Sequence, residues 1–598
     1  MASANLRPRN ELLYLATVFF VVLTVYLYSA PRTVVLEDDG LFILAAYFNG
    51  ISHPPGYPLF TLLAHWMTYL PIGSIAYRVH MLSAVFGALA CACLYYLLRL
   101  LIPGRIYAGS AAIALGFSRI FWSQSIISEV YTLNAFLFLW LCILALRYVE
   151  KEPGTDSRRV LMLMALLYGL SLSNHWPLII LSTPVLMIIV WSRWRSLCHE
   201  MLFAVPFLLI GLLPYAWMVV RSQMGPEFSF YGQLESWRDF WFVISRKGYA
   251  GLDQSVTAGW WDKWQFCGFV LRESALQFGP FGTVFSLFGF ICQWRKWPVR
   301  IGLALVTGYI CNTFVLIGLL GFDYELLHRN IFRVYPIITY CIMALWLGLG
   351  MYVLVDWLAG KCRDRVGGRL LKAAAAVLLI GTALALNVSV NYRATDNWAE
   401  TYAHAVLDNI EKNAILFTDG DLDMSPLGYF NKVEQLRPDV TLYNHKGVGF
   451  SNRLFFPLRN SLNERRQNIR TFIEGQTRPV YYTYGLPHDY QVIKYGLYQK
   501  INTDPEAKLE KSVATYEIVD YFKQLLVAGE PADAWESMHF KLLTTDYCAL
   551  SLNLLRDVEN SGSADAALTD WIKVICNGYH GLLEQINYNL TFNKIIIV

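Results

Sequence analysis

The chain has 598 residues, of which 55% are apolar and only 16% are charged. A soluble globular protein carries roughly 25% charged residues, so this composition excludes a soluble single-domain enzyme. The net charge is only +4, which leaves no strongly basic surface of the kind that binds nucleic acid.

The charge is distributed unevenly along the chain. Residues 1–391 carry 29 Lys and Arg against 19 Asp and Glu, whereas residues 392–598 carry 20 against 26. About 12% charge cannot coat a soluble surface, but about 22% can. We therefore predict a mainly α, polytopic transmembrane domain over residues 1–391 and an extracytoplasmic soluble domain over residues 392–598.

Apolar segments long enough to cross a bilayer recur through the first part. A crossing helix needs about 20 apolar residues, and we predict about eleven crossings. The first is interpreted as a retained signal anchor, because no convincing cleavage site follows it. The predicted spans are residues 11–30, 76–100, 106–118, 133–148, 160–174, 177–192, 201–220, 276–293, 301–321, 337–358 and 371–391.

The cations between these spans predict the orientation. They fall in alternate short loops, which the positive-inside bias assigns to the cytoplasm. An odd number of crossings then places the N-terminus inside and the soluble domain outside, in a bacterial inner membrane or, in a eukaryote, the endoplasmic reticulum. The cytoplasmic cations are Arg99, Arg105, Lys151, Arg158, Arg159, Arg193, Arg195, Arg295, Lys296, Arg300 and those from Lys361 to Lys372.

The soluble part begins with strands that alternate with helices. Strands are expected at Ala414–Thr418, Val440–Tyr443 and Pro479–Tyr484, which predicts a small α/β unit over about residues 413–503. A helical region is expected over about residues 513–598. Cys548 and Cys576 could form a disulfide there only in an oxidising compartment.

Three adjacent carboxylates, Glu37, Asp38 and Asp39, follow the first span. One interpretation is a solvated turn. However, the next residues, Leu41 to Phe48, are apolar and would hold the carboxylates against the bilayer, where an unpaired charge is costly. These are candidate catalytic groups. A divalent metal bound by all three is an alternative that we do not favour, and no cofactor is assigned.

A proline-rich turn, His53-Pro54-Pro55-Gly56-Tyr57-Pro58-Leu59-Phe60, comes shortly afterwards. Its rigid, non-helical backbone at membrane depth is typical of a segment that lines a cavity. His53 either binds an anionic group or only satisfies the turn.

Further polar clusters fall in the predicted outer loops. Cations there contradict the usual charge bias, and they favour either lipid headgroups or a polyprenyl phosphate as their partner. The candidate phosphate-binding residues are His53, Arg246, Lys247, His328, Arg329 and Arg333, and the candidate cavity residues are Tyr57, Glu129, Asn174, His175 and Tyr249.

Asp419, Asp421 and Asp423 resemble part of a calcium loop. Phe430 stands where the closing glutamate of such a loop would be. A capped helix N-terminus is therefore the favoured interpretation.

The run from Asp38-Asp39-Gly40 to His53-Pro54-Pro55-Gly56-Tyr57-Pro58-Leu59-Phe60 resembles the transmembrane protein 260 family (domain of unknown function 2723). Gly169 to His175 and Leu436 to Thr441 agree with this resemblance. It implies a GT-C class membrane glycosyltransferase, a polyprenyl-phosphate sugar donor and a catalytic base at Asp38. The family pattern has a second acid where this chain has Leu41, so Asp39 is the alternative.

We therefore expect an inverting glycosyltransferase that moves a sugar from a polyprenyl-phosphate donor to a protein or glycan acceptor on the extracytoplasmic face. The rival hypothesis is a lipid-linked sugar flippase or transporter, which would also need many helices and a cationic cavity. The charges gather at one membrane face and no inverted repeat is evident, so the enzyme is favoured.

Overall fold

The computed structural model describes residues 8–483, 490–495, 497–502, 515–516, 530–531 and 533–544. The chain divides into two compact units. Unit 1 comprises residues 1–32, 55–220 and 253–395. Unit 2 comprises residues 33–54, 221–252 and 396–598, so it combines two segments of the predicted outer loops with the polar C-terminal part.

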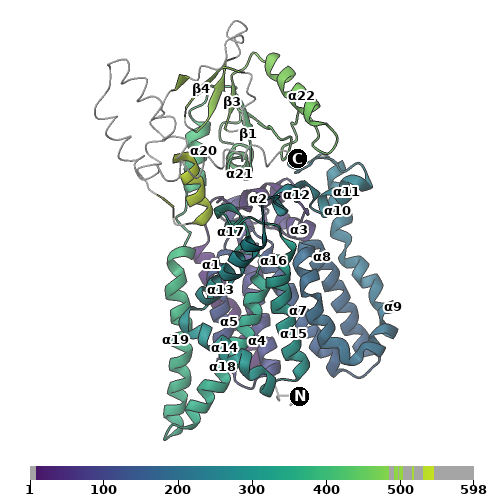
Figure 1. Cartoon of the computed structure of the whole chain (residues 1–598), viewed down its shortest axis with the longest axis vertical. Coiled ribbons are helices and arrows are strands. Elements are labelled where there is room, and N and C mark those ends of the chain that lie inside the picture. The colour runs from purple at the N-terminus through teal and green to yellow at the C-terminus, as the bar shows by residue number, and fades with distance from the viewer. Residues whose placement is uncertain are drawn as a thin grey trace, which may run out of the picture. The chain divides into compact units, whose positions relative to one another are not determined.

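Unit 1 is a bundle of helices that run alongside one another (Figure 1). The long helices pack against one another in the order in which they occur in the chain. Helix α1 packs on α4, α4 on α7, α7 on α8 and α8 on α9. The helices lying wholly or mostly in unit 1 are α1 (Pro8–Ser29), α3 (Pro58–Met67), α4 (Ile75–Leu101), α5 (Arg105–Gly116), α6 (Arg119–Ser123), α7 (Tyr131–Glu150), α8 (Thr155–Val190), η1 (Trp191–Arg193), α9 (Trp194–Gly211), α10 (Leu213–Gln223), α13 (Trp260–Gln277), α14 (Gly279–Lys296), α15 (Val299–Ile310), η3 (Cys311–Val315), α16 (Leu316–Leu319), α17 (Leu326–Phe332), α18 (Ile337–Gly360) and α19 (Arg365–Asn391).

Each predicted span overlaps a helix of this bundle, but the span 106–118 corresponds to α5, which has only 12 residues and is not among the helices able to cross a membrane. Among the described residues, 7 helices are long and apolar enough to cross a membrane, or up to 8 if the bent pair α13 and α14 counts as one span. One of these seven, Thr155–Gln223, is 69 residues long and contains three of the predicted spans. The chain is an integral, multi-pass membrane protein.

Helix α8 is a helical hairpin rather than one straight rod. His175 has non-helical angles, φ −144° and ψ 82°, and Pro177 follows it closely. The Tyr168 hydroxyl lies 2.7 Å from the Thr183 hydroxyl, although a straight helix would separate residues 15 positions apart by about 22 Å. The two halves therefore run back along each other, as the separate predicted spans 160–174 and 177–192 require.

Helix α13 was not predicted from the sequence, because most of it lies between the predicted spans 201–220 and 276–293. Asp262, Lys263, Arg272 and Glu273 interrupt its apolar pattern, so hydropathy alone does not identify it. The helix bends by 109° into α14, where Gly279 has φ +67°.

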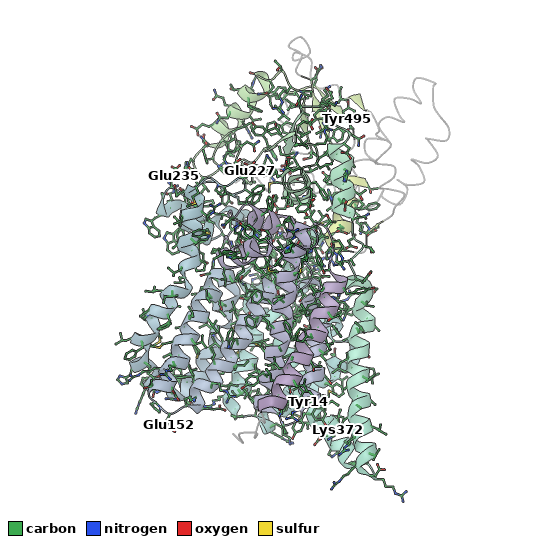
Figure 2. All side chains as sticks on the ribbon, turned by 180° about the vertical axis from the view of Figure 1, so that it is seen from behind. Tyr14, Glu152, Glu227, Glu235, Lys372 and Tyr495 are labelled. Carbon is green, nitrogen blue, oxygen red and sulfur yellow. The ribbon has the colours of Figure 1, made fainter. Side chains whose placement is uncertain are left out.

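Polar networks join the loops that carry the predicted cytoplasmic cations. Glu11 binds Arg99 and Arg105, at 3.2 and 2.7 Å. Lys372 binds Asp356 at 2.6 Å, and that carboxylate also accepts a hydrogen bond from Tyr107. Figure 2 shows Tyr14, Glu152 and Lys372 at the same end of the bundle. The alternate loops therefore share one end of unit 1, as the charge pattern requires.

Among its described residues, unit 2 contains a sheet of six strands in the order β2-β1-β3-β5-β4-β6. The strands β1, β2 and β3 are parallel, with Ile415 paired to both Thr441 and Val480. Its elements are α2 (Asp39–Tyr47), α11 (Trp237–Ile244), η2 (Lys247–Tyr249), α12 (Ala250–Asp253), α20 (Trp398–Leu407), β1 (Ile415–Thr418), α21 (Asp421–Gly428), η4 (Tyr429–Val433), β2 (Thr441–Asn444), α22 (Leu462–Glu474), β3 (Val480–Tyr482), β4 (Val492–Lys494), β5 (Gln499–Ile501) and β6 (Thr515–Tyr516).

The core of this sheet is aromatic and aliphatic. Phe417 of β1 stacks on Tyr482 of β3 with ring centroids 4.5 Å apart. Ile469 and Ile473 of α22 complete the same cluster, and α22 lies beside the strands in Figure 1. The three predicted strands are present within one or two residues of their expected bounds. Strand β6, in contrast, falls where a helical region was expected, because it pairs with β4.

A helix is present at residues 534–544, inside the region predicted to be helical. Most of that region, with Cys548 and Cys576, lies outside the described residues.

The three segments of unit 2 are joined by backbone hydrogen bonds. The Phe230 amide donates to the Ile51 carbonyl at 2.9 Å, and the Ser229 amide donates to the Gly449 carbonyl at 2.8 Å. Helix α2 also packs on α21. The segment after the first predicted span, residues 33–54, is thus built into the same compact unit as the sheet, and it carries two of the candidate site residues, Asp38 and His53.

Candidate active site

Asp38 and His53 form the centre of the candidate site in unit 2. Asp38 occupies the position before α2, yet its side chain does not cap the helix. Instead, its Oδ2 lies 3.2 Å from Nε2 of the buried His53. The Ser52 hydroxyl lies 3.2 Å from His53 Nδ1. If that hydroxyl donates, Nε2 carries a proton directed at the carboxylate.

The three adjacent carboxylates have different surroundings. Asp39 is fully buried, and its Oδ2 accepts a hydrogen bond from the Val35 amide at 2.9 Å, which closes the turn before α2. Glu37 is also buried and has φ +75°, in the left-handed region. Only Asp38 is half-exposed. The turn therefore presents one carboxylate of the three.

Arg246, Lys247 and Tyr249 come from the second loop segment of unit 2. Arg246 has φ +58°, its Nη1 donates to the Pro54 carbonyl at 3.1 Å, and its guanidinium lies 5.2 Å from the Tyr249 ring centroid. The Tyr249 ring lies 6.3 Å from the His53 ring. Lys247, in contrast, is exposed. The geometry brings Arg246 and Tyr249 to the Asp38–His53 pair.

The electrostatics of this cluster keep Asp38 charged. Burial raises the pKa of the Asp38 carboxyl, but the charge and hydrogen bond of His53 and the charge of Arg246 outweigh it and hold the pKa below its usual value. Asp38 is therefore ionised at neutral pH, which is the state that a general base requires.

The loop after β1 contributes a second carboxylate cluster to unit 2. Asp419 forms ion pairs with His445 and with Lys446, the latter at 2.6 Å. Asp423 is buried, and its Oδ2 accepts hydrogen bonds from the Asp419 amide and the Thr483 hydroxyl. The expected helix N-terminus is present, since α21 begins at Asp421, but the predicted cap is not formed by these carboxylates: the N-cap residue is Gly420, with no side-chain cap hydrogen bond.

Asp421 lies within charge-interaction range of the candidate base. Burial raises the pKa of Asp421 to about 6, with a further contribution from the negative charge of Asp38, while His53 and Lys446 act in the opposite direction. Nothing in the sequence pattern linked Asp421 to Asp38, because the two residues are far apart in the chain. The loop that contains Asp421 directly follows the first strand of an α/β unit, and loops at that position often bind ligands. This position was the sequence signal that could have marked Asp421 as a site residue.

The other predicted cavity residues lie together in unit 1. The His175 ring, at the break of α8, lies 5.6 Å from the rings of both Tyr57 and Tyr131. Asn174 Nδ2 donates to the Val130 carbonyl at 3.0 Å, and the Glu129 carboxylate accepts from the Val130 amide at 3.2 Å. This aromatic and amide cluster was predicted except for Tyr131.

Asn134 lies on the first turn of α7, next to that cluster, and is fully buried. Neither side-chain atom of its amide has a hydrogen-bond partner in the described part of the chain. An unsatisfied buried amide costs about 1–3 kcal/mol, so this position calls for a polar ligand or water.

The remaining predicted cations lie on and after α17, in unit 1. His328 is buried, with Nδ1 3.1 Å from Glu325 Oε1 and its ring stacked on Phe322 at 4.6 Å. The Arg329 guanidinium lies 5.2 Å from the Tyr324 ring, and Arg333 is half-buried. The structure thus places the predicted site residues in two sets, one in each unit.

A metal site is not formed by the groups that the structure describes. Within those residues, no three or more His, Cys, Asp or Glu side chains are placed to hold a metal ion. Asp39 in particular uses one carboxylate oxygen in the bond to Val35.

The architecture is that of a known class of membrane protein. The fold is similar to the crystal structure of ArnT from Cupriavidus metallidurans bound to undecaprenyl phosphate, with a TM-score of 0.52, 13% identity, and coverage of 84% of this chain and 100% of that chain. The fold is therefore of the GT-C type.

The family resemblance is confirmed by two segments. Residues 38–199 match the family model of the Protein O-mannosyl-transferase TMEM260 N-terminal domain, and residues 399–449 match TMEM260-associated domain 2. The chain is 29% identical over 441 residues to Protein O-mannosyl-transferase TMEM260 of Mus musculus, and 23% identical over 444 residues to Protein O-mannosyl-transferase tmem260 of Dictyostelium discoideum. These alignments cover 72% and 68% of this chain, but only 62% and 54% of the two relatives.

Proposed function

We propose that this chain is a membrane glycosyltransferase that moves a mannosyl group from a polyprenyl-phosphate donor to a hydroxyl group of a protein. The observation that carries the proposal is the ionised Asp38, held 3.2 Å from His53 beside an otherwise buried acidic turn. The names of the relatives support mannose and a protein acceptor. The undecaprenyl phosphate named for the ArnT structure supports a polyprenyl-phosphate donor.

The proposed reaction is a single displacement with inversion. The acceptor hydroxyl oxygen attacks the anomeric carbon and forms the new C–O bond, while the bond from that carbon to the phosphate oxygen breaks. The electron pair of the broken bond leaves with the lipid phosphate. Asp38 takes the hydroxyl proton as general base, with Asp39 as the less exposed alternative. Glu37, which is buried, would shape the turn.

His53 is proposed to position Asp38 and to keep it ionised. Its contact with the carboxylate favours this role, because an imidazolium or imidazole N–H at 3.2 Å stabilises the charged form. The same ring remains a candidate for contact with the donor phosphate. Charge that grows on the leaving phosphate is best stabilised by cations fixed in advance.

The other proposed phosphate ligands are Arg246 and Lys247 in unit 2, and His328, Arg329 and Arg333 in unit 1. Of the first two, Arg246 is oriented by its bond to Pro54, while Lys247 is exposed. The aromatic and amide side chains around His175 are proposed to line the path of the sugar or its lipid. This set comprises Tyr57, Glu129, Asn174 and His175, with Tyr249 assigned from unit 2.

The experiment is sugar transfer by the purified protein in lipid nanodiscs. Polyprenyl-phosphate mannose with a radioactive sugar is the donor, and a mixture of Ser- and Thr-containing peptides is the acceptor. We expect labelled peptide from the wild type and a rate about 10²- to 10⁴-fold lower for Asp38→Asn, which keeps the size of the side chain but removes the base.

Asp408→Asn is the matched control, since Asp408 is an exposed residue whose ion pair with His404 is worth little. Transfer by Asp38→Asn at the wild-type rate would assign the base to another group. Uptake of intact lipid-linked sugar into vesicles without any transfer would instead support the transporter.

A further inference from the structure

The loop Asp419–Asp423 occupies the position where open α/β sheets bind their ligands. The parallel strands follow the order β2-β1-β3. The second strand therefore lies on one side of β1 and the third strand lies on its other side. Ligands of such sheets bind beyond the carboxyl ends of the strands, at the point where the order reverses. In this unit that point is the end of β1 and β3, and Asp423 bridges it through its bond to Thr483.

The loop Asp419–Asp423 lies close to the candidate base Asp38, because the helices next to them, α21 and α2, pack against each other. A Cβ atom on Gly40 would lie 2.6 Å from Ser425 Cβ, and one on Gly428 would lie 3.1 Å from Leu44 Cδ1. Helices α2 and α21 are therefore in tight contact. Asp38 immediately precedes the first of them, and Asp421 is the first residue of the second. The raised pKa of Asp421, to about 6, is partly due to the negative charge of Asp38 and agrees with this proximity.

Asp421 differs from its two acidic neighbours in making no side-chain hydrogen bond or close ion pair among the described residues, although the charges of His53 and Lys446 act on it. Asp419 is engaged by two cations and Asp423 by two hydrogen-bond donors. Asp421 is half-buried and has no hydrogen-bond partner in the described part of the chain. Desolvating a carboxylate without a hydrogen bond is costly, so such a group is typically completed by a ligand.

Two buried polar atoms near the α2–α21 contact are also unsatisfied. Ser425, whose Cβ meets Gly40, is fully buried, and its hydroxyl has no hydrogen-bond partner among the described residues. Within the same set, Oδ1 of the buried Asp423 also has none. Native proteins leave few such atoms unsatisfied, and they indicate a place where a polar molecule binds.

The negative charge of the loop Asp419–Asp423 favours contact with the acceptor rather than with the donor phosphate. In an inverting transfer the base contacts the acceptor, while the phosphate leaves from the opposite side of the sugar. A carboxylate next to a departing phosphate dianion would oppose the reaction, because the two negative charges repel. A carboxylate close to the base is instead suited to receive hydrogen bonds from hydroxyl or amide groups of an acceptor.

We propose that Asp421 is an acceptor-binding residue, whose carboxylate accepts a hydrogen bond from the polypeptide acceptor next to the hydroxyl that Asp38 deprotonates. This inference rests on the proposed function and assigns part of the acceptor site to the α/β unit.

The experiment separates transfer to a peptide from transfer to water. Donor hydrolysis without peptide needs Asp38 and the donor site, but it does not need a peptide-binding group. We expect Asp421→Asn to raise the KM for a Ser/Thr peptide about tenfold to hundredfold, while donor hydrolysis changes less than about twofold. Asp38→Asn should lower both rates, and Asp408→Asn should change neither.

The outcomes distinguish the two proposals. No transfer and no hydrolysis by the wild type would reject the proposed function itself. Wild-type transfer together with an unchanged peptide KM in Asp421→Asn would overturn the acceptor role alone. A parallel loss of transfer and hydrolysis in Asp421→Asn would also overturn it, because the residue would then act on the donor or on folding. Asp421→Glu, which keeps the charge, should recover part of the peptide affinity.

Discussion

The Asp38–His53 pair shows how a single contact can set the state of a carboxylate in a crowded acidic turn. Three adjacent acids could share protons, yet Asp39 is tied to a backbone amide and Asp38 to an imidazole. These two contacts therefore give the acids different roles. Asp39 holds the turn, and Asp38 faces outward. The side-chain partners, rather than the order of the residues, make this distinction.

Replacing His53 tests how far it controls Asp38. His53→Gln keeps an N–H donor but removes any positive charge, so the pKa of Asp38 should move up towards its usual value. Activity should then be lost at a higher pH on the acid side of the pH–rate profile, and His53→Ala should lower the rate about tenfold further. The measurement is transfer rate against pH, and an unshifted acid limb in both variants would separate His53 from the base.

Asp423 should make the stability of unit 2 depend on pH. Burial, aided by the charge of Asp419, raises the pKa of Asp423 to about 7, although Thr483 and Lys446 act in the opposite direction. The folded state then binds a proton that the unfolded chain has already lost. Stability should therefore fall as pH rises from about 4 to about 7, by at most about 1.4 kcal/mol per pH unit.

Asp423→Asn should flatten this dependence, because an amide oxygen at the Oδ2 position can still accept from both the Asp419 amide and the Thr483 hydroxyl, while the side chain no longer titrates. The measurement is amide hydrogen exchange in residues 415–433 of the full-length protein between pH 4 and 8, corrected for the intrinsic rate. Parallel profiles for wild type and variant would show that Asp423 does not titrate in this range.

At the residue scale the sequence identified the motifs but not their partners. Asp38 and His53 could be proposed because an acidic triplet and a proline-locked turn are unusual beside an apolar span. Asp421 could not be linked to them, since its proximity depends on how α2 packs on α21. Tyr131 and Asn134 were likewise inconspicuous, because their meaning comes from the break of α8 nearby.

At the element scale, the contact between α2 and α21 depends on a missing side chain. Gly40→Ala would place a Cβ 2.6 Å from Ser425 Cβ and 3.1 Å from Val34 Cγ2, so the helices would have to separate. We expect a loss of about 1–3 kcal/mol in the stability of unit 2, and lower transfer because Asp38 moves with α2.

Gly109→Ala is the matched control, because no atom lies within 4 Å of the added Cβ on α5. There the substitution should be neutral or stabilising by up to about 1 kcal/mol, since alanine favours a helix. Thermal unfolding of both purified variants in detergent gives the comparison. Equal melting temperatures would mean that α2 and α21 are not in close contact in solution.

The elements themselves were predictable where one physical signal dominated. Apolar runs indicated every span, and alternating strands and turn residues indicated β1, β2 and β3. Helix α13 was missed because its charges lower the hydropathy of the segment, although Phe266 and Val270 still bury one face. Strand β6 was missed because it has only two residues, Thr515 and Tyr516, and they are recognised as a strand only through their pairing with β4.

At the scale of the whole molecule, unit 2 includes two outer-loop segments of the membrane part as well as the polar C-terminal part. Residues 33–54 and 221–252 supply Asp38, His53 and Arg246, and the polar C-terminal part supplies Asp421. Three segments that are separated in the chain by residues 55–220 and 253–395 must therefore meet for the proposed site to form. Composition predicted a soluble domain after residue 391, but it could not show that the earlier loops belong to the same compact unit.

The orientation of the chain in the membrane is predicted from the end of unit 1 that carries the cation-rich loops. The loops with Arg99, Lys151, Arg193, Arg300 and Lys372 share that end, and positively charged short loops remain in the cytoplasm. A reporter enzyme active only in the cytoplasm should therefore be active when inserted after Glu152, which Figure 2 shows at this end, and silent when fused after Val598. An outward reporter should give the reverse pattern at both positions. Cytoplasmic activity from the Val598 fusion would place the carboxylates of unit 2 on the wrong side for a donor that is used outside, and the proposed face of the reaction would be rejected with the orientation.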